Sequence, residues 1–334
     1  MTTSVDLIDT IIANLDSPSE QAKLQDFQFG GTLRNELLFF FKPECFLVGR
    51  QASRHILQMS FGKLCEFSAE VAGALLLRGP LLERLGSMDR HYGFINRLSR
   101  EASRIVTQQE RAQIYQTLQL PSDANVPVLG GHEFMRTIEP STETNVDRIW
   151  ATKKSAKLRS GFYVQNYDID NREVVVVNGF HPLQLRHFTG PDRVICLLLV
   201  HSNTGWKELR NDLIGATFPE SANPNSIRGE LYRNSGLYGM ESVSIANNCV
   251  HLSAGPFEAG FELRNFIGSL DTLSYEREHT RLYQEFTRQG LTAKDFDHSL
   301  TNPTAQNQDL YTATEDVDTQ PAVSLYKERY TSSR

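Results

Sequence analysis

Cysteine is scarce in this chain and never stands in a metal-binding spacing. The four cysteines, Cys45, Cys65, Cys196 and Cys249, lie far apart and form no Cys-x-x-Cys pair. Because zinc sites are built from closely spaced ligands, we expect no zinc here. Three of the four lie in apolar, strand-like surroundings, where a free thiol behaves as a small hydrophobic side chain. This usage favours a reducing cytoplasm.

Long hydrophobic runs are also missing. The longest covers about seven residues, Val194 to Val200, whereas a membrane-spanning helix needs roughly 20. Residues 1–6 have neither the basic nor the apolar region of a secretory signal. We therefore expect a cytoplasmic protein with no membrane partner.

Positive charge is not in excess. The chain has 34 Lys and Arg against 40 Asp and Glu, a net charge of −6, which argues against nucleic acid as a partner. It contains no Gly-x-x-x-x-Gly-Lys-Ser/Thr loop and no Gly-x-Gly-x-x-Gly turn. P-loop and dinucleotide-binding folds are therefore disfavoured.

Apolar periodicity gives the organisation of the 334 residues, a length typical of about two domains. It predicts an N-terminal helical extension over residues 1–33 and a core in two pieces, 34–92 and 178–268. Residues 93–177 have a different pattern of apolar and polar residues and are predicted to be an insertion or subdomain. Residues 269–334 are predicted to hold one helix and then, from Thr292, a partly disordered tail poor in aliphatic side chains.

Within the core, strands alternate with helices. The predicted elements are strands at 37–41, 64–77, 194–201 and 249–252, with helices at 52–58, 81–92, 206–214 and 256–267. This order indicates an α+β sandwich in which helices cover a mostly antiparallel sheet. In the insertion, two apolar runs flank residues 168–171 and predict a hairpin.

A basic cluster precedes that hairpin. It consists of Lys153, Lys154, Lys157 and Arg159. We favour a solvated surface for it, and the alternative is a lid over a phosphate site.

One set of polar residues carries chemistry. A lone histidine on an apolar strand is usually a core residue, but His251 is followed by Ser253 and, three helical turns downstream, by Glu262. Lys42 and Arg228 precede it along the chain. A histidine with an orienting acid and two cations is what a site needs to move a phosphoryl group through an imidazole ring.

Several segments resemble, in order, those of the nucleoside diphosphate kinase family. They are Phe39-Phe40-Phe41-Lys42-Pro43-Glu44, Asp89-Arg90-His91-Tyr92, Thr189-Gly190-Pro191, Leu213-Ile214-Gly215-Ala216-Thr217, Ser226-Ile227-Arg228-Gly229 and Asn248-Cys249-Val250-His251-Leu252-Ser253. The resemblance covers roughly 35–92 and 178–268. It implies a ferredoxin-like βαββαβ sandwich carrying an inserted subdomain.

The resemblance also implies a role for each site residue. His251 would be the nucleophile that becomes phosphorylated, with Glu262 and Ser253 orienting its ring. Lys42 and Arg228 would bind the transferring phosphoryl group. The remaining predicted nucleotide-site residues are Thr217 at the diphosphate, Tyr92 beside the histidine, Asn248 at a sugar hydroxyl and Phe180 stacking on the base.

The chain departs from the family pattern at one cation. The family's arginine, three residues before the Leu/Ile-Gly pair, is replaced by Asn211, and Arg210 stands one residue earlier. One residue is about 100° around an α-helix. Either the helix register slips, so that Arg210 takes the place of the family's arginine, or a phosphate contact is lost.

Other departures surround the motif. Leu252 and Ala254 flank the serine where the family has glycine and aspartate, Cys45 replaces a glycine, and the loop from Arg228 to Asn248 is longer than the family's.

The resemblance predicts a nucleoside diphosphate kinase. Its partners would be nucleoside tri- and diphosphates, with Mg²⁺ arriving on the nucleotide rather than on protein ligands, and homo-oligomers are common in the family. Two alternatives remain: a phosphohistidine enzyme with another small-molecule or protein acceptor, and a non-catalytic nucleotide-binding or scaffold protein.

Overall fold

The computed structural model describes residues 4–121, 125–159, 161–169, 171–271 and 273–331. The chain forms two compact units, one made of residues 1–81 with 191–334 and the other of residues 82–190. The second unit begins earlier and ends later in the sequence than the predicted insertion, 93–177. Each unit is described separately below.

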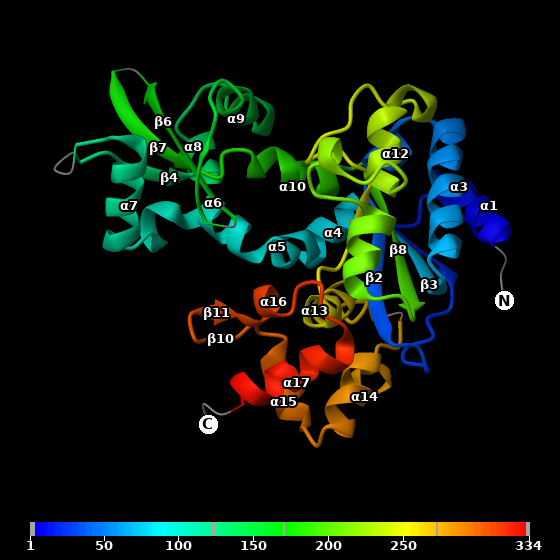
Figure 1. The fold of residues 1–334 in the computed structure, drawn as a ribbon. Coiled ribbons are helices and arrows are strands. Elements are labelled where there is room, and N and C mark those ends of the chain that lie inside the picture. The colour runs from blue at the N-terminus through cyan, green and yellow to red at the C-terminus, as the bar shows by residue number, and fades with distance from the viewer. Residues whose placement is uncertain (1–3, 122–124, 160, 170, 272, 332–334) are drawn as a thin grey trace. The chain divides into compact units, whose positions relative to one another are not determined.

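The first unit is built on a five-stranded sheet with the order β1-β3-β8-β2-β9. Figure 1 labels the strands β2, β3 and β8 of this sheet. Its strands are β1 (Gln21–Gln25), β2 (Asn35–Phe41), β3 (Ala69–Arg78), β8 (Val194–Ser202) and β9 (Val250–Leu252). All neighbouring strands in this sheet are antiparallel. β2 and β8 are central and buried along nearly their whole length.

The connections give a ferredoxin-like βαββαβ fold. β2 is joined to β3 through α3 (Arg50–Glu66), and β8 to β9 through α11 (Trp206–Glu208) and the helix η1 (Leu209–Ile214). The four core strands lie in the order second, third, first, fourth, as this topology requires. The predicted α+β sandwich with an antiparallel sheet is therefore confirmed.

Helices cover both faces of the sheet. On one face, alternate residues of β2 (Leu37, Phe39 and Phe41) join a core with α1 (Ser4–Asn14), α3 and η1. On the other face Phe40 packs edge-on against Phe266 of α13 (Pro256–Phe266), with ring centroids 5.9 Å apart. Successive strand residues point to opposite faces, so His251, between Val250 and Leu252, shares the α13 face with Phe40.

The region predicted as one strand over 64–77 contains a helix end and a strand. α3 continues to Glu66, and β3 begins at Ala69. Ile56, Leu57, Phe61 and Leu64 are buried at helical spacing, which places Leu64 on the helix rather than on the strand.

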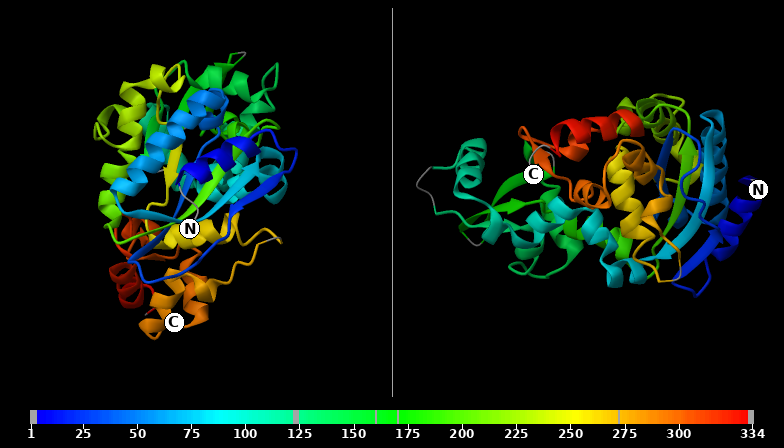
Figure 2. Two further views of the ribbon diagram at one scale, coloured as in Figure 1. Left: turned by 90° about the vertical axis from the view of Figure 1, so that its right-hand side faces the viewer. Right: turned by 90° about the horizontal axis from the view of Figure 1, so that it is seen from below.

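The C-terminal segment differs from the prediction of partial disorder. It forms α14 (Arg281–Arg288), α15 (Ala293–Ser299), α16 (Leu310–Ala313) and α17 (Thr319–Arg329), gathered around α13 in Figures 1 and 2. Its polar residues act as helix caps: Thr292 and Asp295 form a capping box, and Asp309 caps α16. Its few aromatic side chains pack with Phe257 of α13 in one buried cluster. Composition alone does not reveal this use of polar and aromatic residues.

The second unit has a four-stranded sheet of order β4-β7-β6-β5. Its strands are β4 (Val128–Gly130), β5 (Ala156–Arg159), β6 (Phe162–Ile169) and β7 (Arg172–Val177). Its helices are α5 (Ser87–His91), α6 (Gly93–Ile105), α7 (Gln108–Leu118), α8 (Gly131–Met135), α9 (Glu143–Trp150) and α10 (His181–Thr189), and α4 (Gly79–Leu85) leads into it. The predicted hairpin is confirmed as the antiparallel pair β6–β7.

Basic side chains of the cluster at residues 153–159 pack over aromatic rings of the second unit. The ammonium of Lys153 is 4.9 Å from the ring centroid of Tyr167, and the guanidinium of Arg159 is 4.4 Å from that of Phe94. Arg159 also forms an ion pair with Glu110 at 2.7 Å. These contacts favour the interpretation of the cluster as part of a solvated surface rather than a lid over a phosphate site.

No helix in the described part of the chain is long and apolar enough to cross a membrane.

Candidate active site

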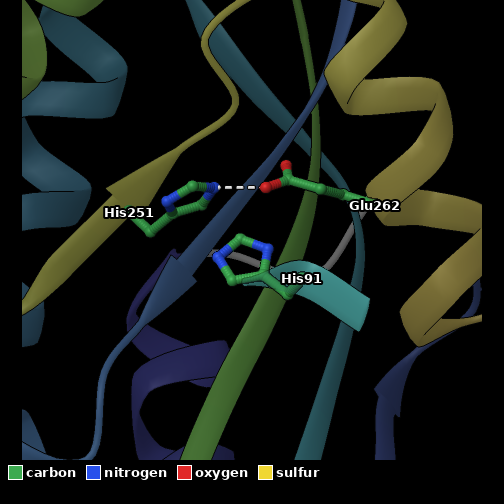
Figure 3. Close-up of side chains that lie close together, drawn as sticks. All are labelled: His91, His251 and Glu262. Carbon is green, nitrogen blue, oxygen red and sulfur yellow. Dashed lines mark hydrogen bonds and ion pairs between the residues drawn. The ribbon is translucent and has the colours of Figure 1, made fainter. Parts of the chain in front are cut away.

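A hydrogen-bonded chain joins His251, Glu262 and Ser253. Nε2 of His251 on β9 lies 2.7 Å from Oε1 of Glu262 on α13, as Figure 3 shows. The second oxygen of Glu262, Oε2, accepts from the Ser253 hydroxyl at 2.5 Å. The Glu262 side chain is buried, while that of His251 keeps 18% of its surface exposed. A carboxylate on Nε2 favours the tautomer with the proton on that nitrogen and the lone pair on Nδ1.

The β2 strand fixes this chain in place. Ser253 accepts a hydrogen bond from the backbone N–H of Leu38 at 3.2 Å, which orients its hydroxyl toward Glu262. Phe40 lies directly across from His251 in the β2–β9 ladder, and the two rings stack with centroids 4.4 Å apart. The imidazole is therefore held by its strand, by a ring on one side and by a carboxylate at Nε2.

Lys42 stands at the end of β2, beside the start of β9. Its ammonium donates to Oδ1 of Asn248 at 2.7 Å, and its backbone N–H donates to the carbonyl of Cys249 at 2.8 Å. Burial lowers the pKa of Lys42; the charge of Glu44 opposes this effect and that of Arg228 adds to it. The structure thus brings together Lys42 and Asn248, which are separated by most of the chain.

Glu44 holds the turn that enters β9, a role that the sequence reasoning missed. Its Oε1 accepts hydrogen bonds from the backbone N–H groups of Asn248 at 3.0 Å and Cys249 at 2.9 Å. Cys249 has φ of +66°, in the left-handed region. The available signal was position, since Glu44 directly follows the Lys42-Pro43 pair. The Cys45 thiol, buried beside this turn, donates to the carbonyl of Cys249 at 3.0 Å.

Arg228 lies in the first turn of α12 (Ile227–Arg233), which Ser226 caps. Its guanidinium donates to the carbonyls of Gly215 at 3.0 Å and Val250 at 3.1 Å. Val250 directly precedes His251, so Arg228 is fixed against the strand that carries the histidine. Its Nε is buried and has no hydrogen-bond partner in the described part of the chain. Burial, together with the positive charge of Arg210, lowers the pKa of Arg228 to about 10.

Arg210 stands in a helix with an unusual register. Residues Leu209–Ile214 form a π-helix, and Gly215 donates its N–H to the carbonyl of Arg210, five residues earlier, at 3.1 Å. In an α-helix the partner would be four residues earlier, at Asn211. The π-turn therefore accommodates one extra residue and gives Arg210 the angular place that an α-helix would give Asn211. The helix register therefore slips by one residue at Arg210, and a contact of Arg210 with phosphate stays a prediction.

The guanidinium of Arg210 has acidic partners from the C-terminal segment. Its Nη1 lies 2.6 Å from Oε1 of Glu315 and 2.9 Å from Oδ1 of Asp316. No motif in the polar tail distinguishes these two acids, so sequence reasoning had no means of pairing them with Arg210.

The remaining predicted site residues are Thr217, Tyr92 and Phe180. Thr217 is exposed, shortly after η1. Tyr92 and Phe180 belong to the second unit, where the Tyr92 ring packs against His181 and the Phe180 ring against Trp150. Their assigned roles stay predictions.

No protein-family model matches the chain, and no curated protein matches it. Among solved structures it is similar to the nucleoside diphosphate kinase of Encephalitozoon cuniculi, with 13% identity over 72% of this chain and 94% of that chain and a TM-score of 0.36. It is also similar to an NDP kinase from Pyrobaculum aerophilum, with 16% identity, 73% and 98% coverage and a TM-score of 0.34. A third is the Borrelia burgdorferi enzyme with bound vanadate and ADP, with 15% identity, 73% and 93% coverage and a TM-score of 0.33. At these identities the similarity concerns the fold alone, which the sheet topology already defines.

Proposed function

We propose that the chain is a nucleoside diphosphate kinase-like phosphotransferase. It moves the γ-phosphoryl group of a nucleoside triphosphate to His251 and from there to a nucleoside diphosphate. The observation that carries the proposal is the series of hydrogen bonds that links Ser253, Glu262 and His251. Two cations, Lys42 and Arg228, are bound to Asn248 and Val250, which precede His251 along the chain. A histidine that served only packing would not need a buried carboxylate with its own orienting hydroxyl.

The reaction divides into two similar halves. The lone pair on Nδ1 of His251 attacks the γ-phosphorus, and the bond between that phosphorus and the β–γ bridging oxygen breaks, releasing the diphosphate. The phosphorylated ring gains positive charge, which Glu262 stabilises through Nε2–H. In the second half a terminal oxygen of the acceptor diphosphate attacks the phosphorus, and the histidine leaves as neutral imidazole.

Lys42 and Arg228 neutralise charge on the transferring group. Lys42 supplies a compact ammonium. Arg228 has a buried Nε–H with no partner among the residues that the structure describes, and it can donate this group to a ligand oxygen. Ammonium and guanidinium groups do not ligate Mg²⁺, so the site fits an ion that phosphate oxygens carry in with the nucleotide. Bound in that way, Mg²⁺ would neutralise further phosphate charge.

Arg210 is assigned to the remaining phosphate charge. The π-helix gives it the angular place of Asn211, and its positive charge acts on Arg228. Thr217 would donate its exposed hydroxyl to the diphosphate, and Asn248 would contact the sugar while holding Lys42. Tyr92 and Phe180 keep the roles that the family resemblance implies.

The test is incubation with γ-labelled ATP and Mg²⁺, followed by acid and alkali treatment of the protein. His251→Gln is compared with His55→Gln, the same change at an exposed histidine of α3. We expect an acid-labile, alkali-stable label that His251→Gln abolishes and His55→Gln preserves, and that unlabelled nucleoside diphosphates remove.

Two other results would overturn the proposal in different ways. A His251-dependent label that diphosphates do not remove would indicate another acceptor. No label despite measurable nucleotide binding would indicate that the fold serves binding alone.

A further inference from the structure

A turn of the C-terminal segment is built against the loop that follows the catalytic motif. The backbone N–H of Asp316 donates to the carbonyl of Ala254 at 2.9 Å, and Ala254 directly follows Ser253. At Gly255 a Cβ would lie only 2.5 Å from the carbonyl oxygen of Thr314. This close backbone approach shows that the turn over residues 314–316 is seated on the loop.

The turn presents two carboxylates to one arginine. Glu315 and Asp316 both accept from Nη1 of Arg210, at 2.6 and 2.9 Å. Burial alone would lower the pKa of Arg210, but the hydrogen bond that it donates to Glu315 and the negative charges of Asp316 and Glu315 raise its pKa above the usual value. One guanidinium facing two carboxylates leaves a local charge of about −1, which repels an incoming phosphate.

Arg210 is also the cation that the proposed function assigns to the nucleotide's remaining phosphate charge. Carboxylate and phosphate oxygens present similar acceptors to a guanidinium fork, so they compete for it. We infer that Glu315 and Asp316 form an acidic latch, an internal anion that occupies Arg210 and must release it before a nucleoside diphosphate or triphosphate binds fully. This inference rests on the proposed function and adds a regulatory contact to the same site.

The latch can open without unfolding the segment that carries it. The Glu315 side chain keeps 49% of its surface exposed and that of Asp316 34%, so water can replace Arg210 at both carboxylates. The segment has a separate anchor at Asp318, which accepts from Arg34 at 3.0 Å, from the Asn35 side chain at 2.8 Å and from the backbone N–H of Trp206 at 2.8 Å. These contacts hold the start of α17 whatever Arg210 does.

The experiment measures ADP binding in the presence of Mg²⁺ by titration calorimetry, on the full chain and on Glu315→Gln/Asp316→Asn. Both changes keep side-chain size, and asparagine tolerates the positive φ of +62° at position 316. The matched control, Glu66→Gln/Glu70→Gln, removes two carboxylate charges at exposed positions where α3 ends and β3 begins, and β3 is separated from β2 in the sheet by β8. A third protein adds Arg210→Gln to the latch variant, and thermal melting confirms that each is folded.

We expect the latch variant to bind ADP about tenfold more tightly than the wild type, as for the release of a charge-assisted pair. The control should bind like the wild type, and adding Arg210→Gln should remove the gain. Unchanged or weaker binding by the latch variant would overturn the latch and leave the proposed function standing; weaker binding would mean that the acids position Arg210. No ADP binding by any folded protein would overturn both.

Discussion

The carboxylate of Glu44 accepts a hydrogen bond from the backbone N–H of Cys249 at 2.9 Å, across a turn in which Cys249 has φ of +66°. A non-glycine residue in the left-handed region carries a backbone cost of about 1–3 kcal/mol, which the surroundings must offset. Here the same oxygen also accepts from the N–H of Asn248. Glu44 therefore holds the conformation that aims Asn248 at Lys42 and starts the strand carrying His251.

Replacing Glu44 should affect both stability and chemistry. Glu44→Gln keeps an acceptor oxygen but loses the charge, and we expect the free energy of unfolding to fall by about 1.5–3 kcal/mol, the range for a charge-assisted hydrogen bond. The rate of phosphohistidine formation should fall as well, because Lys42 loses its fixed partner. Urea unfolding and a labelling time course measure the two effects. Glu66→Gln, at the exposed end of α3, should change neither; equal effects at both sites would contradict the assigned role.

The Glu262 carboxylate should act on chemistry more than on nucleotide binding. Glu262→Gln removes the negative charge that stabilises the phosphorylated ring, so we expect labelling of His251 to slow by about 10- to 100-fold. Ser253→Ala should slow it less, because Glu262 keeps its charge and its bond to Nε2 of His251. Rapid-quench labelling gives the rates, and calorimetry should show ADP affinity within about twofold of the wild type, roughly 0.4 kcal/mol. A loss of affinity that matches the loss of rate would indicate a structural role.

Chain order and residue type were enough to predict which polar residues lie close together, while their functional roles stay predictions. The ferredoxin-like topology brings Lys42 and Arg228, from two other segments, to the stretch 248–262 that holds Asn248, His251, Ser253 and Glu262. The sheet was predictable because apolar runs and helical stripes alternate in the order that this topology requires.

The parts that were not predictable depend on backbone detail and on tertiary docking. A π-turn is set by one additional residue in a helix, and the identities of Asn211 and Arg210 do not reveal which of them the register favours. The C-terminal helices are stabilised by a few aromatic side chains among polar residues that serve as caps. The amino-acid composition does not distinguish aromatic residues that form a core or polar residues that cap helices from those of a disordered segment. It therefore predicted disorder for this segment.

Nucleotide affinity should fall at alkaline pH because of Lys42. Burial lowers its pKa below the usual 10.5, so the ammonium loses its proton at a lower pH than an exposed lysine does. ADP binding should therefore weaken as the pH rises through this lowered pKa. Lys42→Arg keeps the charge across that range, so its affinity, whatever its value at pH 7, should change less with pH. Parallel profiles for the two proteins would contradict this account. Calorimetric titration of Mg²⁺–ADP at a series of pH values gives both curves.

Glu258 should make the folded state less stable as the pH rises. It lies one turn before Glu262 on α13, and burial, together with the charge of Glu262, raises its pKa to about 8. The folded chain therefore binds this proton more tightly than the unfolded chain, whose glutamate has its usual value of 4.5. By linkage, the contribution to stability is complete below the unfolded pKa and is lost as the pH rises through about 8.

Melting temperatures between pH 5 and pH 9 measure this loss. Glu258→Gln imitates the protonated side chain, so it should flatten the dependence, and the difference in stability between variant and wild type should grow with pH. Glu70→Gln, at an exposed position of β3, should leave the slope of the wild type intact. If Glu258→Gln also kept that slope, a group other than Glu258 would be responsible for the dependence of the melting temperature on pH. The proximity of Glu258 to Glu262 would then not explain it.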